Sequence, residues 1–430
     1  MRNKLKIEID HFKSQPHNFR ILIFTNLVYA FVLPVIDTFV AAYIMRNTNG
    51  DITKVVIYQL TIYTGIPLTF LLNGFLLKHF DIRKLYSAGM MLSGVSMVVM
   101  MSLRELNTAG IAGAGMIMGL SFGFYWANRD CLALSITNNG NRNYYYGMET
   151  LFYTIISVII PVTIGLYIDS QISDAQKHTA YLAITGVVFL ITVAASIVCF
   201  RGTFKNPGEK KYIFFKFHPL WYKLLTLASL KGLAQGFLVT APAMLILQFF
   251  GNEGALGSAT SIGAIIAAII MYILGRISKP SDRLKIFICG LGLFALGAAI
   301  NGVLFSQVGV VIFILLLLIA KPLMDLAYFP IQFRVIDIVS KIEKRSEFAY
   351  ILNHEAGLYV GRFSGAVTFL LMARYGSADI ALRYAVVIIG VLQLSSIFVA
   401  KNIIAQGKTL SGEGGAIDAK VLGTVAEALV

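Results

Sequence analysis

Two stretches of equal length, GFLLKHFDIRKLYSAG at Gly74–Gly89 and GRISKPSDRLKIFICG at Gly275–Gly290, share one pattern of residues. Glycine, lysine, aspartate, lysine and glycine recur in both stretches, always 201 positions apart. A second similarity, or echo, relates two sets of Asp, Glu and Tyr that follow one another in the same order. They are Asp130, Glu149 and Tyr153, and Asp337, Glu355 and Tyr359. Chance could produce either echo alone, but together they predict a chain built from two similar halves.

The composition of the 430 residues excludes most classes of protein. Hydrophobic residues make up 57% and charged residues only 13%, whereas soluble domains contain about 45–50% and about 25%. So few polar residues could not cover the outside of a water-soluble protein. We therefore exclude a soluble enzyme, a disordered chain and a nucleic-acid-binding domain, and predict an all-α, polytopic membrane protein.

Twelve stretches are apolar over the roughly 20 residues that a helix needs to cross a bilayer. They cover 21–45, 55–77, 85–102, 109–135, 146–168, 179–200, 222–249, 256–275, 286–303, 310–333, 348–373 and 384–400. The predicted organisation is a cytoplasmic N-terminal segment (1–20), a six-helix bundle (21–200), a cytoplasmic linker (201–221), a second, pseudo-symmetric six-helix bundle (222–401) and a cytoplasmic tail (402–430).

The positive charges gather on one side of the predicted membrane. With the N-terminus inside, the inner segments hold 25 of the 36 Lys and Arg residues, the outer loops hold six and the spans hold five. The positive-inside rule then places both termini in the cytoplasm. This bias explains the net charge of +14 without nucleic acid as a partner. The absence of an Asn-x-Ser/Thr sequence favours a bacterial cell (inner) membrane.

The twelve spans, the two halves, the basic central loop and the loop that starts at Gly74 resemble the major facilitator superfamily over about residues 20–401. Gly74, Leu76 and Arg83 fit the family's inner-loop signature, Gly-x-Leu-x-Asp-Arg-x-Gly-Arg-Lys, whereas Lys78 and Asp81 replace its aspartate and its second glycine. The resemblance implies a transporter that moves a small molecule by alternating access, with spans 1, 4, 7 and 10 around a central cavity. We expect no cofactor and no metal, and a monomer in the lipid bilayer.

Five charged residues lie deep in the predicted spans: Asp37, Lys231, Lys321, Asp325 and Arg362. Each costs about 2.5–3.5 kcal/mol at mid-membrane even on the mildest scale. Spans 3, 6, 9 and 12 contain no charged residue. A polar cavity between the halves would remove most of this cost, so we predict that the five charges surround such a cavity.

Asp37 follows Pro34 in FVLPVIDTFV, and the proline can kink the helix and leave carbonyl groups available beside the acid. Burial favours the protonated form of a carboxyl group. Asp37 is therefore the predicted proton-coupling site. The alternative is a structural ion pair with Lys231 or another cation.

The other deep charges lie on helical stripes with polar neighbours. Lys321 and Asp325 share a face with Tyr328, and Lys231 shares a face with Gln235. These residues either contact the substrate or neutralise one another, as an intrahelical Lys321–Asp325 pair would do.

Further stripes carry a guanidinium group and aromatic rings. Arg362 either holds an anionic group of the substrate or forms a ladder with Glu355. In span 4, Tyr125 and Trp126 either line the cavity or pack against neighbouring helices. Small residues at helical spacing predict close helix packing at Gly115, Gly119 and Gly123, and at Gly357, Gly361 and Gly365.

Charges near the inner ends of the spans resemble ion-pair gates that open and close. The candidates are Lys78, Asp81, Arg83, Arg129, Asp130 and Glu149 in the first half, with Arg142 nearby, and Lys279, Asp282, Asp337 and Glu355 in the second half.

The chain carries no catalytic or nucleotide-binding motif, so we predict a protein that is not an enzyme and that draws on an ion gradient. Three deep cations against two deep anions favour an anionic or zwitterionic solute. The predicted function is proton-coupled secondary transport of such a solute. The nearest alternative is a drug or lipid exporter that exchanges protons, although Ile160-Pro161 and Gly165 match the span 5 motif of such antiporters only in part. A membrane-embedded enzyme or a sensor is the third possibility.

Overall fold

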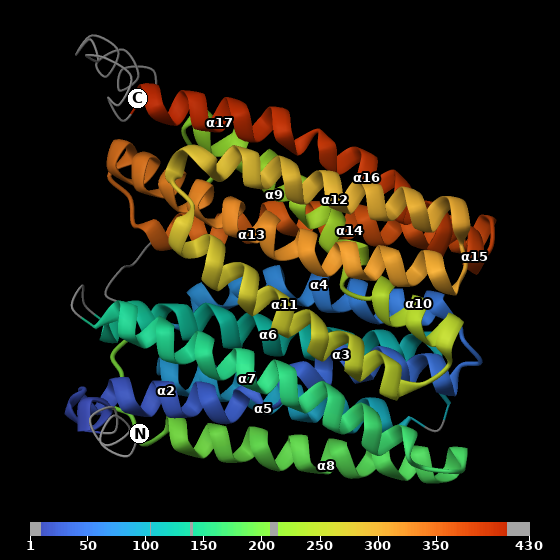
Figure 1. Ribbon diagram of the computed structural model, residues 1–430. Helices are drawn as coiled ribbons and strands as arrows, with labels where there is room; N and C mark the ends of the chain where they lie inside the picture. The colour runs from blue at the N-terminus through green and yellow to red at the C-terminus, as the bar shows by residue number, and fades with distance from the viewer. Residues whose placement is uncertain (1–9, 104, 138–140, 207–213, 411–430) are drawn as a thin grey trace.

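The computed structural model describes residues 10–103, 105–137, 141–206 and 214–410, and the statements below concern these residues (Figure 1). The expectations for the start of the N-terminal segment (1–9) and the end of the tail (411–430) lie outside them, as does the side chain of Arg142. The helices of the first half are α2 (His17–Ala30), α3 (Leu33–Asn47), α4 (Ile52–Leu76), α5 (Ile82–Ser102), α6 (Thr108–Ile136), α7 (Arg142–Asp169) and α8 (Asp174–Cys199).

The second half repeats this all-helical architecture. Its elements are α9 (Pro219–Leu238), α10 (Ala241–Phe250), α11 (Glu253–Ile277), η1 (Pro280–Asp282), α12 (Arg283–Leu304), α13 (Gln307–Glu343), α14 (Glu347–Tyr375), α15 (Ala378–Ile380), the π-helical turn η2 (Ala381–Ala385), α16 (Val386–Leu394) and α17 (Ser396–Leu410).

Twelve segments of the described chain are long and apolar enough to cross a membrane, which confirms the predicted fold class. Two spans extend well beyond the sequence prediction: the last span runs from Ala378 to Leu410 rather than over 384–400, and α13 continues to Glu343 rather than ending near residue 333. The helix runs through Pro322 and Pro330. Its last turns contain charged residues, so hydropathy could not reveal that the helix continues there.

Spans 1 and 7 are each broken into two helices at corresponding places. The first span breaks between α2 and α3, and the seventh breaks between α9 and α10. Pro34 and Pro242 lie in the first turns of α3 and α10, where the missing proline N–H costs the helix nothing. The prolines therefore start new helices instead of only kinking continuous ones.

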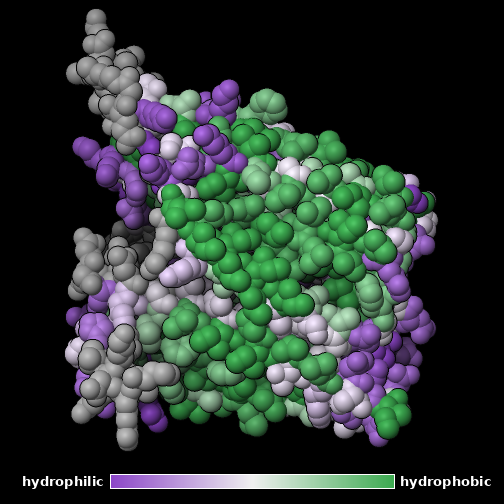
Figure 2. Space-filling view, in the orientation of Figure 1, coloured by the Kyte–Doolittle hydropathy of each residue, from purple (hydrophilic) through white to green (hydrophobic). Residues whose placement is uncertain are grey.

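The two halves lie side by side, with α2 to α8 in one and α9 to α17 in the other (Figure 1). The start of α2 and the end of α17 lie at the same end of the molecule, which we call the termini end, and α3 and α11 meet at the opposite, far end. Figure 2 shows a broad apolar surface across the middle and hydrophilic residues towards both ends. This distribution is that of a multi-pass membrane protein.

Two glycine seams bring helices of the same half into close contact, as the sequence predicts. A Cβ atom on Gly119 would lie 2.9 Å from the Cα of Gly65, so α6 and α4 pack backbone to backbone. In the second half, a Cβ atom on Gly361 would lie 2.6 Å from the backbone nitrogen of Leu233. Larger side chains would push these helices apart, and only small residues permit this packing.

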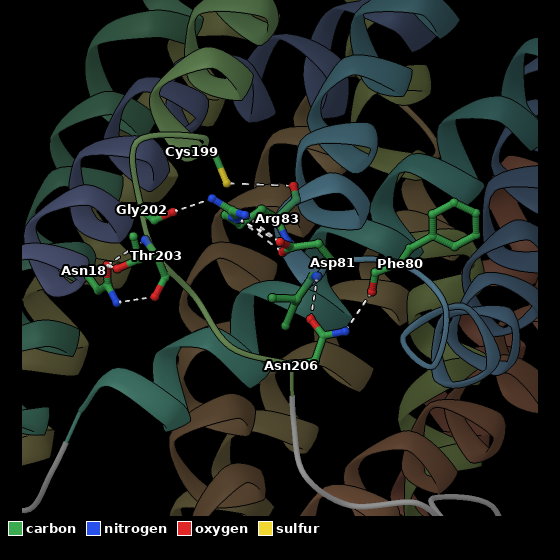
Figure 3. A network of polar contacts seen from close by, with 9 residues as sticks. Asn18, Phe80, Asp81, Arg83, Cys199, Gly202, Thr203 and Asn206 are labelled. Carbon is green, nitrogen blue, oxygen red and sulfur yellow. Dashed lines mark hydrogen bonds and ion pairs between the residues drawn. The ribbon is translucent and has the colours of Figure 1, made fainter.

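The start of the linker is bound to the first half (Figure 3). Asn206 accepts a hydrogen bond from the backbone N–H of Ile82 at 2.8 Å. Its amide donates to the carbonyl oxygens of Leu77 and Phe80, each at 2.8 Å. These bonds fix Asn206 against the turn between α4 and α5, so this part of the linker belongs structurally to the first bundle.

Candidate functional site

The breaks in spans 1 and 7 mark the centre of the molecule. Interrupted helices in corresponding positions of two repeats are a sequence-level indicator of a transporter binding site. Asp37 lies one turn after the break in α3, and Lys231 and Gln235 lie on α9 before the break in span 7. The predicted site residues therefore flank the two breaks.

Lys231 and Asp325 form an ion pair between α9 and α13. Lys231 Nζ donates to Asp325 Oδ1 at 2.7 Å. The ammonium group also lies over the rings of Tyr328 and Phe329, at 4.0 and 4.1 Å from their centroids. A carboxylate and two aromatic faces compensate the charge of Lys231. Lys231 is thus neutralised within the second half and does not neutralise Asp37.

A cavity of about 110 Å³ lies beside this pair. Its polar lining comes from five predicted site residues, Lys231, Gln235, Lys321, Asp325 and Tyr328, and from Gln393 and Ser396, which were not predicted. The remaining walls are mainly apolar side chains from α9, α12 and α13. The cavity combines a few polar groups with apolar walls, which is the usual composition of a small-molecule site.

Arg362 lies in a ladder with its own helix neighbour Glu355. The guanidinium group forms a short ion pair with Glu355, and its Nε donates to Gln235 Oε1 at 3.0 Å. It also lies 5.2 Å from the ring centroid of Tyr63 on α4. The geometry agrees with the predicted ladder, which in addition bridges the two halves through Tyr63.

Asp37 and Lys321 differ from the other deep charges. Both side chains are exposed, and neither forms a hydrogen bond or an ion pair with another described residue. The expected intrahelical pair of Lys321 with Asp325 is not formed, because Lys231 of α9 occupies the carboxylate of Asp325. The charge of Lys321 instead acts on Asp37, and the two residues belong to different halves, on α13 and α3.

The aromatic candidates are mostly packing residues. Tyr125 is fully buried, and its hydroxyl group lies 3.1 Å from that of Tyr153. Trp126 contacts Tyr125 edge to face and lies under the guanidinium group of Arg129. Tyr328 is also buried, and its hydroxyl group hydrogen-bonds to His354 Nε2 at 2.6 Å. Tyr125 therefore fits the packing alternative, because no part of its side chain reaches an open surface.

The gating candidates of the first half form two clusters near the termini end. Arg129 pairs with Asp130 at 2.6 Å and forms a short ion pair with Glu149. Glu149 is buried and also accepts a hydrogen bond from Asn26 at 2.7 Å. This cluster connects α2, α6 and α7 within one half.

The second cluster holds the repeated loop. Arg83 pairs with Asp81 at 2.6 Å and donates to the carbonyl of Gly202 at 3.0 Å (Figure 3). Hydrogen bonds from the Arg83 side chain hold the pKa of Asp81 below its ordinary value. Lys78 is exposed and lies over the ring of Phe75. The loop is thus an anchor for the linker.

The candidates of the second half are less connected. The backbone N–H of Lys279 donates to Asp282 Oδ2 at 2.9 Å, which forms a local turn. Asp337 is exposed on α13, and Glu355 pairs with Arg362 rather than with a residue of the repeated loop. The two sequence echoes therefore place equivalent residues at equivalent positions but not in equivalent ion pairs.

One cluster that sequence reasoning missed joins the two halves at the far end. Arg46 of α3 binds Glu253 of α11 through two parallel bonds, Nε to Oε1 at 2.6 Å and Nη2 to Oε2 at 2.7 Å. The side chain of Glu253 is 0% exposed, and it also accepts a bond from the Tyr181 hydroxyl at 3.1 Å. Arg46 contacts Asp174 at 3.0 Å as well. In the sequence, Arg46 and Glu253 look like ordinary charges at span ends.

Close packing reinforces this far-end contact. A Cβ atom on Gly257 of α11 would lie 3.2 Å from the Cα of Gly165 on α7. The Tyr63 hydroxyl of α4 donates to the carbonyl of Gln235 on α9 at 2.8 Å. The ion pairs described near the termini end, by contrast, each join residues of a single half. Among the described ion pairs, the one that joins the two halves, Arg46–Glu253, therefore lies at the far end.

A second missed cluster lies where the linker enters the second half. The buried carboxylate of Glu343 pairs with Arg345 at 2.9 Å and forms short hydrogen bonds with Tyr350 and the backbone N–H of His218. Burial lowers the pKa of His218. Glu343 fixes the end of the linker to α13, as Arg83 fixes its start to α5.

Comparison with known proteins identifies the fold. The profile described as "Major Facilitator Superfamily" matches residues 22–344. The chain is 23% identical over 368 residues to YqgE of Bacillus subtilis, covering 85% of this chain and 84% of that protein. It is 28% identical over 161 residues to a protein encoded in the sodM 3' region of Geobacillus stearothermophilus, covering 37% of this chain and 74% of that protein.

Solved transporters share the architecture. The nucleoside transporter NupG superposes with a TM-score of 0.65 at 9% identity, covering 90% of this chain and 99% of that chain. A bacterial homologue of the iron transporter ferroportin in an inward-facing state also superposes with a TM-score of 0.65, at 14% identity, covering 91% of this chain and 98% of that chain. At these identities the likeness concerns the fold alone.

Proposed function

Because this chain belongs to the Major Facilitator Superfamily and is a transporter rather than an enzyme, we propose that it is a proton-coupled secondary transporter of a small anionic or zwitterionic solute. The solute would move by alternating access. The two halves would rock about the central residues, with Arg46–Glu253 closing the far end in one state. The transporter would act as a monomer.

One observation carries this proposal. At the far end the halves are joined by a two-bond ion pair to a buried carboxylate, while Asp37 and Lys321 stay exposed in the middle of their spans. Unpaired charges inside a membrane protein are costly unless they face a polar cavity. A closed end and exposed central charges are what one state of an alternating-access cycle requires.

The sidedness follows from the charge distribution. The inner segments hold 25 of the 36 Lys and Arg residues, so the termini end would face the cytoplasm across the cell (inner) membrane. The conformation described here would then be open to the cytoplasm. A drug or lipid exporter remains the second candidate of the same fold, and no specific observation favours it.

Proton coupling is assigned to Asp37, because an exposed carboxyl group beside a helix break can exchange a proton from the cavity. The test uses the purified chain in vesicles that carry a pH-sensitive dye inside. Solutes from an anionic and zwitterionic panel should cause a proton flux in wild type, and Asp37→Asn should abolish that flux.

Glu347→Gln is the matched control, because Glu347 is an exposed acid at the start of α14, away from the central charges. It should retain the wild-type flux. If Asp37→Asn accumulates solute with an unchanged proton dependence, Asp37 is not the coupling site.

A further inference from the structure

The ion pairs of the centre leave two charges of opposite sign available to a ligand. Lys231, Asp325 and Arg362 are compensated by described partners. Asp37 and Lys321 are exposed, and neither forms a hydrogen bond or ion pair within the described residues. The apparent excess of deep cations in the sequence therefore reduces to one anion and one cation.

These two charges come from different halves. Asp37 lies on α3 of the first half, and Lys321 lies on α13 of the second half. The charge of Lys321 acts on Asp37, and Lys321 also lines the central cavity beside Gln235 and Tyr328. A solute that reaches both charges would touch both halves at once.

We propose that Asp37 and Lys321 form the two poles of a site for a zwitterionic solute, with its ammonium group at Asp37 and its carboxylate group at Lys321. The proposal rests on the proposed transport function and narrows it to one class of solute. A simple anion would be attracted by Lys321 but repelled by Asp37. A simple cation would be attracted by Asp37 but repelled by Lys321. A zwitterion compensates both charges and leaves no unpaired ion in the closed cavity.

The same geometry gives the proton a defined role. A proton on Asp37 removes the charge that holds the ammonium group, so proton and solute exclude each other at this residue. The titratable or charged groups that act on Asp37 are Tyr29 of α2, Tyr58 and Tyr63 of α4, and Lys321 of α13. Lys321 is the only basic group among these four. Coupling would then take the form of exchange.

The experiment measures binding to the purified full chain by calorimetry. The probes are leucine, glutamine and γ-aminobutyrate, each compared with its N-acetyl derivative, which lacks the cation, and its amide, which lacks the anion. At least one zwitterion should bind at least about 10-fold tighter than both of its derivatives, because each charged contact is worth about a tenfold change or more. Its affinity should fall as the pH is lowered.

Two variants assign the poles. Asp37→Asn should lower the affinity for the zwitterion by about 10-fold or more. The affinity for the N-acetyl derivative should stay the same or rise. Lys321→Gln should lower the affinity for the zwitterion by a similar factor and leave the affinity for the amide unchanged. Glu347→Gln should change none of these affinities.

Three results would overturn the proposal. They are the absence of binding for every zwitterion in the panel, an N-acetyl derivative that binds as tightly as its parent, or two variants that lower thermal stability without changing ligand preference. Transport itself is tested separately by the proton flux into vesicles. A flux driven by simple anions would support the proposed transport function and contradict only the zwitterion site.

Discussion

The pairing of Lys231 with Asp325 decides which charges in the centre remain available to a solute. Both side chains are largely buried, with 16% and 29% exposure. A buried ion pair contributes little net stability, yet removing one partner leaves the other charge uncompensated. The pair therefore acts on selectivity, because it takes one cation and one anion out of the site.

Lys231→Met should destabilise the protein, by about 3 kcal/mol if Asp325 stays charged and unpaired. Adding Asp325→Leu should recover much of this loss, since the double variant buries no charge. Thermal unfolding of the single and double variants in the same detergent measures both effects. If the double variant lost as much stability as the two substitutions add up to, the side chains would not act as a pair.

Asp81 provides a pH prediction outside the spans. Its pKa lies below the ordinary Asp value because Arg83 donates hydrogen bonds to the carboxylate. A lowered pKa in the folded state contributes stability that is present above the ordinary value, about 3.9, and is lost as the pH falls through the lowered value. Wild type should therefore lose stability below about pH 4 more steeply than Asp81→Asn.

Unfolding midpoints of the two proteins across this pH range check the prediction. Asp10→Asn is a suitable control, because Asp10 is an exposed acid. Parallel curves for wild type and Asp81→Asn would exclude a contribution from the Asp81–Arg83 pair.

At the scale of helices, the glycine seams set how closely the elements of each half approach. A Cβ atom on Gly361 would lie 2.6 Å from a backbone atom of α9, so no rotamer change can make room for it. Gly361→Ala should destabilise the protein by about 1–3 kcal/mol through overpacking.

Gly292 is the matched control for this substitution. It lies within α12, and an added Cβ atom would meet nothing within 4 Å. Gly292→Ala should leave stability unchanged or raise it slightly, because alanine favours the helix more than glycine does. A Gly361→Ala variant as stable as Gly292→Ala would contradict the close seam between α9 and α14.

Most of the elements could be predicted from sequence, because twelve apolar runs and a two-fold repeat leave few other arrangements. The end of α13 could not, since its last turns, RVIDIVSKIE, mix charged residues with apolar ones. The breaks in spans 1 and 7 were visible only as Pro34 and Pro242. Whether a proline kinks a helix or starts a new one depends on the neighbouring helices.

The candidate site residues could be proposed from the sequence, but their pairing could not. The residues near the breaks could be found because a charge in an apolar run is conspicuous, as for Asp37 and Lys321. Which cation meets which anion depends on the packing of α9 against α13, and no spacing within one helix encodes that distance. Arg46 and Glu253 escaped notice because charges are ordinary at the ends of spans.

At the scale of the whole molecule, an ion pair joins the halves at the far end, and the ion pairs described at the termini end each stay within one half. Arg46 and Glu253 form the strongest polar contact between the halves in the described chain, through two bonds to a fully buried carboxylate. If the halves alternate as proposed, removing it should shift the equilibrium towards the opposite state, because the contact would exist in only one of the two states.

Distances between spin labels on the two halves can follow both ends of the molecule. At the far end, Ile172 of the first half and Tyr375 of the second are 95% and 84% exposed. At the termini end, His79 and Lys341 are exposed positions on the first and second halves. Each pair is introduced as cysteines after replacement of the three native cysteines.

The most direct test of alternating access is double electron–electron resonance on these two pairs in wild type, Arg46→Ala and the control Lys177→Ala. Wild type and Lys177→Ala should show a short far-end distance and a long termini-end distance. Arg46→Ala should lengthen the far-end distance and shorten the termini-end distance together. Unchanged distances in Arg46→Ala, or a widening at both ends at once, would contradict two halves that rock about a central site.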